Sequence, residues 1–212
     1  MTKPTRTFEV VIAVDECKGC ERCVNACPRG VLRMGTHLNK LGFPAVTLTG
    51  QPCIGCGGCA AGKGCVFGGV VNEAIEKAKT ADAFVFGTPV HYASASGNMT
   101  SFMDRLAYAG GKYLAYKPAA ICASARRAGT TTTLDQLVKY PEFFHMPLVS
   151  GSYWPMVHGS KPEQVLEDEE GCAVMRELGR NMAWLLKCIE LGKANGITHP
   201  ENPRRPMTNF IR

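Results

Sequence analysis

The chain has 212 residues and a formal net charge of +6 at pH 7. Its hydrophobic content of 45% and its charged content of 20% are ordinary for a globular protein, which excludes a disordered or fibrous chain. Lysine and arginine are scattered along the chain, so composition does not indicate nucleic-acid binding. No apolar run approaches the roughly 18 residues needed to span a bilayer, and the first ten residues contain no apolar signal region. We therefore expect a soluble, cytoplasmic protein without a membrane partner.

The most informative feature is the cysteine content, because eight of the 11 cysteines fall in two clusters before residue 66. Close spacing and the lack of a signal region favour metal-bound thiolates in a reducing compartment over disulfides. The first cluster has the spacing C-x2-C-x2-C-x3-C and is followed by Pro28. It consists of Cys17, Cys20, Cys23 and Cys27. This spacing is typical of bacterial ferredoxins, whereas zinc sites usually pair two cysteines with distant ligands. The spacing predicts a 4Fe-4S cluster.

The second cluster has the spacing C-x2-C-x2-C-x5-C and no following proline. It consists of Cys53, Cys56, Cys59 and Cys65. These cysteines can hold a cluster of their own, or Cys65 can cross over to the first cluster, as the fourth cysteine does in two-cluster ferredoxins. The spacing leaves both arrangements open. We predict two clusters.

Downstream of the cysteines, strand-like and helix-like segments alternate. The predicted strands are AFVFG at 83–87, AAICASA at 119–125 and PLVSGSY at 147–153. The predicted helices are EAIEKAKTA at 73–81 with Asn72 as its cap, one through Met99 and Leu106, one through Leu134 and Val138, and one from about Cys172 to Leu191. Such alternation predicts a parallel sheet covered by helices on both faces. Cys122, Cys172 and Cys188 lie in apolar patterns and are predicted to be small buried residues.

Ligands of such sheets bind beyond the carboxyl ends of the strands. We therefore expect the loops at 88–98, 124–131 and 151–159 to line one cleft.

Two parts of the chain resemble known families. Within residues 8 to about 50, FEVVIAVDECKGCERCVNACPRGVL and LNKLGFPAV look like the start of a bacterial two-cluster ferredoxin domain. Within residues 53–212, CIGCGGC, FGTPVHYASASGNMTSFMDRL and KPAAICASARRAGTTTTLDQL resemble the iron-sulfur flavoprotein branch of the NAD(P)H-dependent FMN reductase family. The resemblance implies an α/β chain with a ferredoxin-like α+β iron-sulfur module at 1–65 and a flavodoxin-like domain at 66–212.

The resemblance also implies an FMN site in the loops. It suggests that Thr88 to Tyr92 and Ser96 to Asn98 wrap the flavin ring and ribityl chain, while Ser124 to Thr130 contact its far edge. The residues so implied are Thr88, Pro89, Val90, His91, Tyr92, Ser96, Gly97, Asn98, Ser124, Arg126, Arg127, Gly129 and Thr130. No catalytic residue is identified.

The sequence departs from the family at its start. Members normally open with a strand and a Ser, Thr and Asn-rich loop that receives the FMN phosphate, whereas here FEVVIAVD runs into ECKGCERC. Either the cysteine-rich segment replaces the first strand, helix and second strand, or FEVVIAVD and PAVTL occupy those two strand positions. Arg126 and Arg127 are candidates for holding the phosphate, because guanidinium groups bind phosphate bidentately.

The resemblance implies an oxidoreductase that moves electrons between an NAD(P)H- or ferredoxin-type donor, FMN and 4Fe-4S clusters. The alternative is a ferredoxin-like electron carrier or cluster-binding protein without flavin, which the missing phosphate loop favours. A zinc-stabilised interaction protein is a third possibility. The expected partners are a redox protein or a nicotinamide donor, and family members commonly form homo-oligomers.

Overall fold

The computed structural model describes residues 32–38, 40–41, 44–48, 52–201, 206 and 208, with 32–38 and 44–48 given by their backbone. The first cysteine cluster, from Cys17 to Cys27, and the segment FEVVIAVD lie outside the described residues. The chain divides into two compact units, residues 1–56 and 57–212, which we describe separately. Within the described ranges, no helix combines the length and apolar character that a membrane span requires.

The described strands of the first unit form a two-stranded antiparallel sheet. β1 (Leu32–Leu38) pairs with β2 (Pro44–Leu48), and the register joins Met34 to Val46 and Leu38 to Pro44. Pro44 is the first residue of its strand, a position where a missing N–H group is tolerated. The segment PAVTL is therefore β2 of this small sheet. The suggestion that PAVTL is a strand of the larger parallel sheet is wrong.

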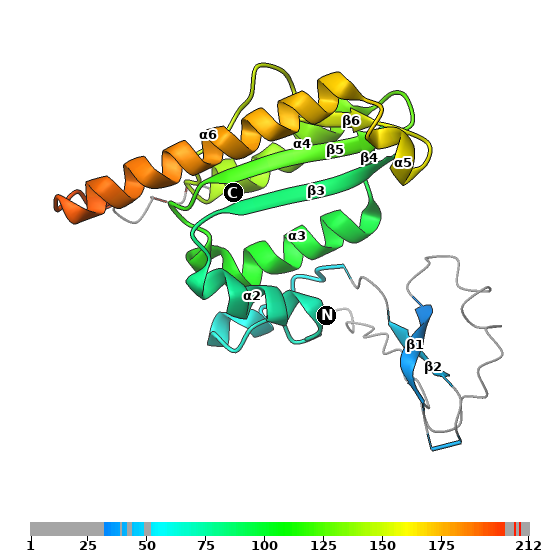
Figure 1. The fold of residues 1–212 in the computed structure, drawn as a ribbon. Coiled ribbons are helices and arrows are strands. Elements are labelled where there is room, and N and C mark those ends of the chain that lie inside the picture. Colours follow the sequence, from blue (N-terminus) through cyan, green and yellow to red (C-terminus); the bar gives the residue numbers. More distant parts are fainter. Residues whose placement is uncertain are drawn as a thin grey trace. The chain divides into compact units, whose positions relative to one another are not determined.

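The second unit is built on a four-stranded sheet with the order β4-β3-β5-β6 (Figure 1). β3 (Phe84–His91), β5 (Ala119–Ala125) and β6 (Met156–His158) are parallel, and β4 (Ser94–Ala95) folds back antiparallel on the end of β3. The parallel sheet predicted from the alternating segments is confirmed, and the segment AAICASA forms β5 as predicted.

The predicted third strand is wrong in its position. PLVSGSY contributes only an isolated bridge between Leu148 and Ala119, and the strand forms at β6 instead. The reason is a tertiary contact. Ser152 donates from its backbone N–H and its hydroxyl to Glu177 of the last helix, and Asn181 donates to the carbonyl of Ser150. These bonds join residues 150–152 to α6, while Pro147, Val149 and Pro155 on either side of them bond to the backbone of β5.

Four long helices cover the sheet. They are α2 (Val70–Thr80), α3 (Gly97–Gly110), α4 (Thr130–Phe143) and α6 (Glu169–Ala194); α5 (Pro162–Val165) and two short 3-10 helices, Gly58–Ala61 and Gly111–Tyr113, complete the set in the described residues. Figure 1 shows α2 and α3 on one side of the sheet and α6 on the other.

The core has two parts because β5 buries both of its faces. Ile121 and Ala123 pack in one cluster with residues of α2, α3 and α4, while Ala120 packs in a second cluster with Leu178 and Met182 of α6. A β-strand turns alternate side chains to opposite faces, so an unbroken apolar strand such as AAICASA requires helices on both sides. The prediction of a flavodoxin-like sheet with helices on both faces is thus confirmed.

The face of β3 on the α6 side is less covered than that of β5. Val85, Gly87 and Pro89 are exposed, whereas Phe86 and Thr88, which alternate with them, are buried. In the described part of the chain, α6 packs over β5 and β6. The carboxyl end of β3 is therefore packed mainly from one face of the sheet.

Candidate functional site

The three parallel strands end at the same edge of the sheet. Pro89 of β3 pairs with Ser124 of β5, and Ser124 pairs with Val157 of β6. The turn after β3 and the turn after β5 are therefore neighbours, and they carry the residues that the resemblance implies for FMN. The structure brings both groups, 88–98 and 124–130, to one edge.

The turn after β3 is a tight hairpin. Val90 pairs with Ala95 and His91 with Ser94, which leaves Tyr92 and Ala93 as the two turn residues. Both have positive φ, 51° and 58°, the geometry that matches the twist of a two-residue hairpin. The hairpin places the Tyr92 side chain in solvent, with a relative exposure of 105%.

Two hydroxyls expected near the flavin are buried and already bonded within the protein. The backbone N–H of Ser96 donates to Thr88 Oγ1 at 3.1 Å, and Thr88 Oγ1 donates to the carbonyl of Pro89 at 3.0 Å. Ser96 Oγ accepts from the N–H of Met99 at 3.2 Å and caps α3. These bonds fix the path from β3 into α3, so Thr88 and Ser96 act by positioning the turn.

The turn after β5 packs directly on the hairpin. Gly129 caps α4 with a φ of 94°, and a Cβ atom there would lie 2.6 Å from the Cα of Ala93. Thr132 Oγ1 donates to the carbonyl of Ala93 at 2.7 Å. The side chain of Gln136, further along α4, accepts from the Ala95 N–H at 2.9 Å and from the Ser94 hydroxyl. Thr132 and Gln136 were not predicted, because nothing in the local pattern shows which turn a helical side chain will meet.

The remaining predicted residues are mostly open to solvent. His91, Gly97, Asn98, Arg126 and Arg127 are exposed. The first N–H groups of a helix have no intrahelical acceptor, so the amino end of α3 at Gly97 and Asn98 offers donors to a polar ligand. Ligand contacts are therefore available from backbone donors and cationic side chains.

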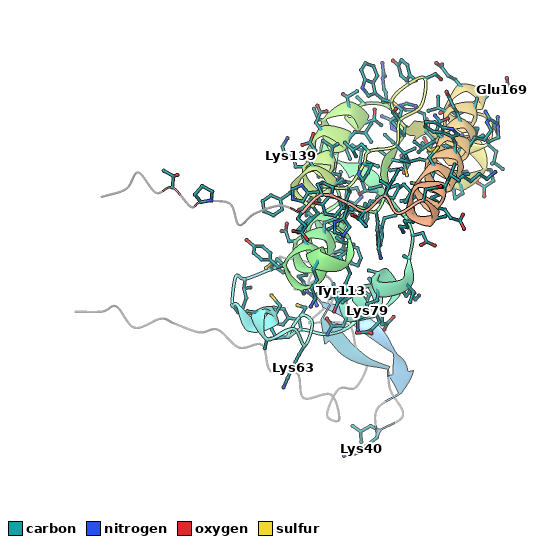
Figure 2. All side chains as sticks on the ribbon, turned by 90° about the vertical axis from the view of Figure 1, so that its left-hand side faces the viewer. Lys40, Lys63, Lys79, Tyr113, Lys139 and Glu169 are labelled. Atoms are coloured by element: carbon teal, nitrogen blue, oxygen red, sulfur yellow. The ribbon has the colours of Figure 1, made fainter. Side chains whose placement is uncertain are left out.

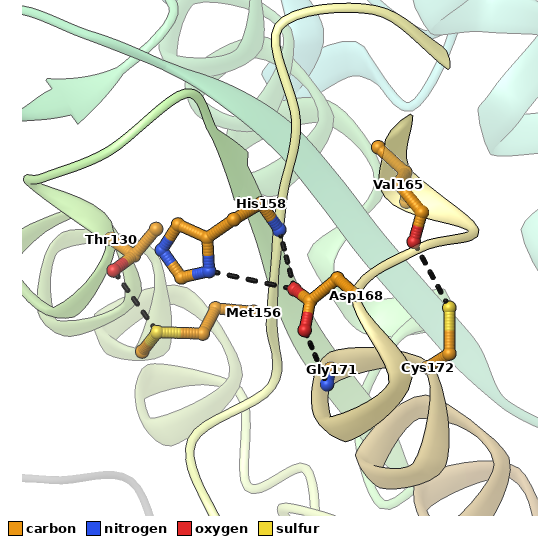
Figure 3. Close-up of polar contacts among 7 residues, drawn as sticks. All are labelled: Thr130, Met156, His158, Val165, Asp168, Gly171 and Cys172. Atoms are coloured by element: carbon orange, nitrogen blue, oxygen red, sulfur yellow. Dashed lines mark hydrogen bonds and ion pairs between the residues drawn. The ribbon is translucent and has the colours of Figure 1, made fainter. Parts of the chain in front are cut away.

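Polar contacts behind the site join β6 to α4 and α6 (Figure 3). Thr130, which is buried, donates to Met156 Sδ at 3.1 Å. Asp168 caps α6 by accepting from the Gly171 N–H, and it also accepts from the His158 N–H at 2.7 Å. These backbone bonds, the one from Gly171 above all, lower the pKa of the Asp168 carboxyl.

The expectation that the loop at 151–159 lines the cleft is only partly correct. Residues 151–155 precede β6 at the side of the sheet, and Trp154 is exposed there. Only the end of the predicted range 151–159 reaches the carboxyl edge, because the strand forms later in the chain than predicted.

The second cysteine cluster lies in a glycine-rich loop. Among the described residues its four cysteines form no disulfide; Cys56 is exposed and the others are half-buried. Cys53 and Cys56 belong to the first unit, and Cys59 and Cys65 to the second. In the described ranges, no three His, Cys, Asp or Glu residues gather as a metal site. The donor set nevertheless suits an iron-sulfur cluster, because it is all cysteine and four of the five glycines between the ligands adopt left-handed backbone conformations that let a loop curl. These glycines are Gly55, Gly57, Gly62 and Gly64.

Cys65 is bonded to side chains of two helices, α2 and α3. Its N–H donates to Asn72 Oδ1 at 2.8 Å, and its carbonyl accepts from Asn72 Nδ2 at 3.0 Å. The predicted helix cap at Asn72 is wrong: α2 begins at Val70 after Gly69, and Asn72 lies in its first turn. The side chain bonds to the cysteine loop in place of its own helix end. On the other side, the guanidinium of Arg105 donates to Cys65 Sγ.

Comparisons of the sequence with known proteins match two regions of the chain. Residues 38–161 match the family of NADPH-dependent FMN reductases, and residues 10–33 match the 4Fe-4S binding domain. The chain is 30% identical over 149 residues to an iron-sulfur flavoprotein of Methanocaldococcus jannaschii; the match covers 66% of this chain and 77% of that protein.

A second relative matches only the amino-terminal part. The chain is 52% identical over 44 residues to the ketoisovalerate oxidoreductase subunit VorC of Methanothermobacter marburgensis, which is 21% of this chain and 56% of that subunit. The chain thus spans little more than half the length of this relative.

Two solved structures are similar to part of the chain. The Trp repressor binding protein from Bacillus subtilis has a TM-score of 0.44 at 18% identity, covering 51% of this chain and 74% of that one. An NADH:FMN oxidoreductase, EMOB in its apo form, has a TM-score of 0.43 at 19% identity, covering 61% of this chain and 64% of that one.

Proposed function

Because the chain belongs to the NADPH-dependent FMN reductase family and matches a 4Fe-4S binding domain, we propose that it is an iron-sulfur flavoprotein oxidoreductase. It moves electrons between an NAD(P)H- or ferredoxin-type donor, FMN and 4Fe-4S clusters. The observation that carries the proposal is the meeting of the 88–98 and 124–130 turns at one edge of the sheet. A cluster-binding protein without flavin is less well supported, because the family match spans both turns.

The carboxyl edge of the sheet has the features that a flavin requires. An isoalloxazine ring needs flat apolar cover and donors near its polar rim. Pro89 and Tyr92 are exposed and offer such cover, and the N–H groups at Gly97 and Asn98 offer donors. FMN, when bound, exchanges electrons in pairs with a nicotinamide and singly with a cluster. The residues of the chain bind and orient it.

The phosphate of FMN needs a site of its own, because the family match begins only at residue 38. We assign this role to Arg126 and Arg127, which are exposed in the turn after β5, close in sequence to the amino end of α4. A guanidinium forms two parallel hydrogen bonds with a phosphate, and a helix amino terminus favours an anion.

We further propose two clusters in a functional module that extends to Cys65. The first is held by Cys17, Cys20, Cys23 and Cys27, and the second by Cys53, Cys56, Cys59 and Cys65. Both sets are all-cysteine with the successive x2 spacings of cluster-binding loops. Thiolates of this kind persist in a reducing compartment, which supports a cytoplasmic location.

A homo-oligomer is supported by an apolar groove between α3 and α4. The groove has a volume of about 640 Å³, and its lining includes Tyr108 and Phe143, both largely exposed. Exposed aromatic side chains around a groove are typical of surfaces that associate. The partner we propose is a second copy of the chain.

The proposed function is tested first on anaerobically purified protein. Iron, sulfide and released FMN are counted per chain, and NADH and NADPH are each tested as reductants. We expect about eight iron atoms and about eight sulfides, as two 4Fe-4S clusters require, together with stoichiometric FMN. Clusters without FMN, even after excess FMN is added, would show an electron carrier. A colourless zinc protein would contradict the proposal altogether.

The phosphate assignment is tested by a variant that carries both Arg126→Gln and Arg127→Gln. Each charge-assisted hydrogen bond contributes about 1.5–3 kcal/mol, so FMN affinity is expected to fall at least tenfold. Riboflavin, which lacks the phosphate, is the matched control ligand, and its affinity is expected to stay unchanged. Lys139→Gln, at an exposed site on α4 (Figure 2), controls for the loss of positive charge. Equal losses for FMN and riboflavin would contradict the assignment.

A further inference from the structure

A buried arginine faces the second cysteine cluster. Arg105 of α3 is only 7% exposed. Its Nε donates to Cys65 Sγ at 3.2 Å, and its Nη2 donates to the carbonyl of Gly68 at 2.7 Å. The guanidinium carbon also lies 5.6 Å from the centroid of the Phe67 ring. Arg105 therefore contacts Cys65 through a hydrogen bond to sulfur, and the residues just after Cys65 through a hydrogen bond to backbone and a cation–π contact.

Both partners of the sulfur contact are held in place. Asn72 fixes the backbone of Cys65 by two hydrogen bonds, and Arg105 is anchored between Met103 and Leu106, which are buried in the core. A long side chain that is fixed at both ends loses little further entropy when it bonds to a ligand atom. The contact is thus a feature of the folded second unit itself.

The charge of Arg105 suits an anionic sulfur. Arginine stays protonated in proteins, and a buried charge is costly unless it is paired. A cysteine that ligates iron is a thiolate, so the guanidinium meets a negative charge when a cluster is bound. Reduction adds one electron and no atom to the cluster, which makes its net charge more negative by one unit. A fixed positive charge and a hydrogen bond to sulfur stabilise that reduced state more than the oxidised state.

We propose that Arg105 is a positioning residue that raises the reduction potential of the cluster ligated by Cys65. It thereby favours electron transfer into that cluster. The inference rests on one element of the proposed function, that Cys65 ligates a cluster. It holds whether Cys65 serves the cluster of Cys53, Cys56 and Cys59 or the first cluster, and it does not require bound FMN.

Lys63 supplies a matched comparison within the same loop. It lies two residues from Cys65, but it is exposed, and its side chain extends away from α3 (Figure 2). Water and salt screen an exposed charge, whereas they screen a buried charge far less. Removal of the Lys63 charge is therefore expected to affect the cluster much less than removal of the Arg105 charge.

The test is a redox titration of the anaerobic, cluster-loaded full chain, followed by electron paramagnetic resonance and absorbance. Arg105→Gln, Arg105→Lys and Lys63→Gln are compared with the unchanged protein, and Cys65→Ser identifies the transition that depends on Cys65. We expect the potential of that transition to move to more negative values in Arg105→Gln, less so in Arg105→Lys, and least in Lys63→Gln. An unchanged potential in Arg105→Gln with full iron and sulfide overturns the inference, and so does an equal shift in Lys63→Gln.

If Arg105→Gln fails to fold, the Arg105→Lys variant tests the inference in its place. Lysine keeps the charge but not the Nε donor, so the iron–thiolate stretching frequencies in resonance Raman spectra are expected to change together with the potential. If both stay as in the unchanged protein, the inference is wrong. FMN is counted in the same samples, so absence of flavin contradicts the proposed function alone. A Cys65→Ser protein with unaltered clusters contradicts the inference.

Discussion

Asn72 connects the first turn of α2 to the cysteine loop through two hydrogen bonds to the backbone of Cys65. Gly64 makes room for it, because a Cβ atom at that position would lie 2.8 Å from Asn72 Oδ1. Arg105 meets the sulfur of the same cysteine. Cys65 is thus bonded to side chains of two helices, Asn72 of α2 and Arg105 of α3.

Replacement of Asn72 by alanine is expected to loosen this loop. Loss of two part-buried hydrogen bonds costs about 1–3 kcal/mol, and a cluster in a looser loop is more open to oxygen. We expect Asn72→Ala to lower the unfolding temperature and to bleach faster in air, as followed by cluster absorbance. Lys77→Ala, at an exposed position of α2, is the control and should change neither. Identical bleaching rates in both variants would show that Asn72 does not support the cluster.

The cysteines outside the clusters differ in exposure. Cys188 on α6 is exposed, so its predicted burial is wrong, whereas Cys122 on β5 is half-buried and burial raises its pKa. A raised pKa leaves less reactive thiolate at neutral pH. We therefore expect iodoacetamide to alkylate Cys188 before Cys122 in the cluster-loaded protein at pH 7, as mass spectrometry of peptides would show. Equal rates would contradict this order.

At the scale of elements, the site depends on how two turns pack together. The hairpin at Tyr92 and Ala93 touches the amino end of α4, and the contact is close because Gly129 has no side chain. Gln136 and Thr132 then tie the hairpin to α4. Packing between the hairpin and α4 therefore fixes the carboxyl edge of the sheet. The positions of the exposed residues in each turn depend on the other turn as well as on their own.

Gly129→Ala is expected to disturb this packing. The left-handed φ of 94° costs a non-glycine residue about 1–2 kcal/mol, and the new Cβ would meet the backbone of Ala93. We expect lower thermal stability and weaker FMN binding, measured by fluorescence titration. Gly179→Ala, at an exposed position of α6 outside both turns, is the matched control, because a Cβ there meets no atom within 4 Å. If Gly129→Ala binds FMN as tightly as Gly179→Ala does, the two turns do not form one site.

At the scale of the whole molecule, the chain combines two family matches, a 4Fe-4S binding domain at residues 10–33 and an FMN reductase at residues 38–161. The fold and the membership of the FMN reductase family are confirmed. The number of clusters is our proposal. A flavin that exchanges electron pairs and clusters that carry single electrons are complementary in one chain. This combination is the reason we propose electron transfer as its task.

The number of clusters can be counted with two ligand variants. In our proposal, Cys20→Ser removes a ligand of the first cluster and Cys56→Ser removes a ligand of the second. If two clusters exist, each variant should lose about half of its iron and sulfide, and Cys20→Ser should keep its FMN. Chemical analysis of anaerobically purified protein provides the measurement. Complete iron loss in either variant would indicate one shared cluster.

Local chemistry made several features predictable from the sequence alone. Ligand spacing predicted an iron-sulfur motif at the first cysteine cluster, where residues 10–33 match a 4Fe-4S binding domain, because a curling loop and its ligands are close neighbours in the chain. The same reading of the second cysteine cluster stays a prediction. The apolar run of β5 predicted a buried parallel strand, since burial on both faces leaves no polar alternation. The loops that form the carboxyl edge were predicted because the order of strands and helices determines where they emerge.

Contacts between distant residues decided the rest. Strand β6 formed at Met156–His158 because Ser152 and Asn181 join the preceding segment to α6, partners that no local pattern relates. Asn72 holds the cysteine loop, and Gln136 holds the hairpin. The sequence alone determined the chemistry of the ligands and the kind of fold. Only the tertiary structure placed Arg105 beside Cys65, since 40 residues separate them and the packing of α3 brings them within hydrogen-bond distance.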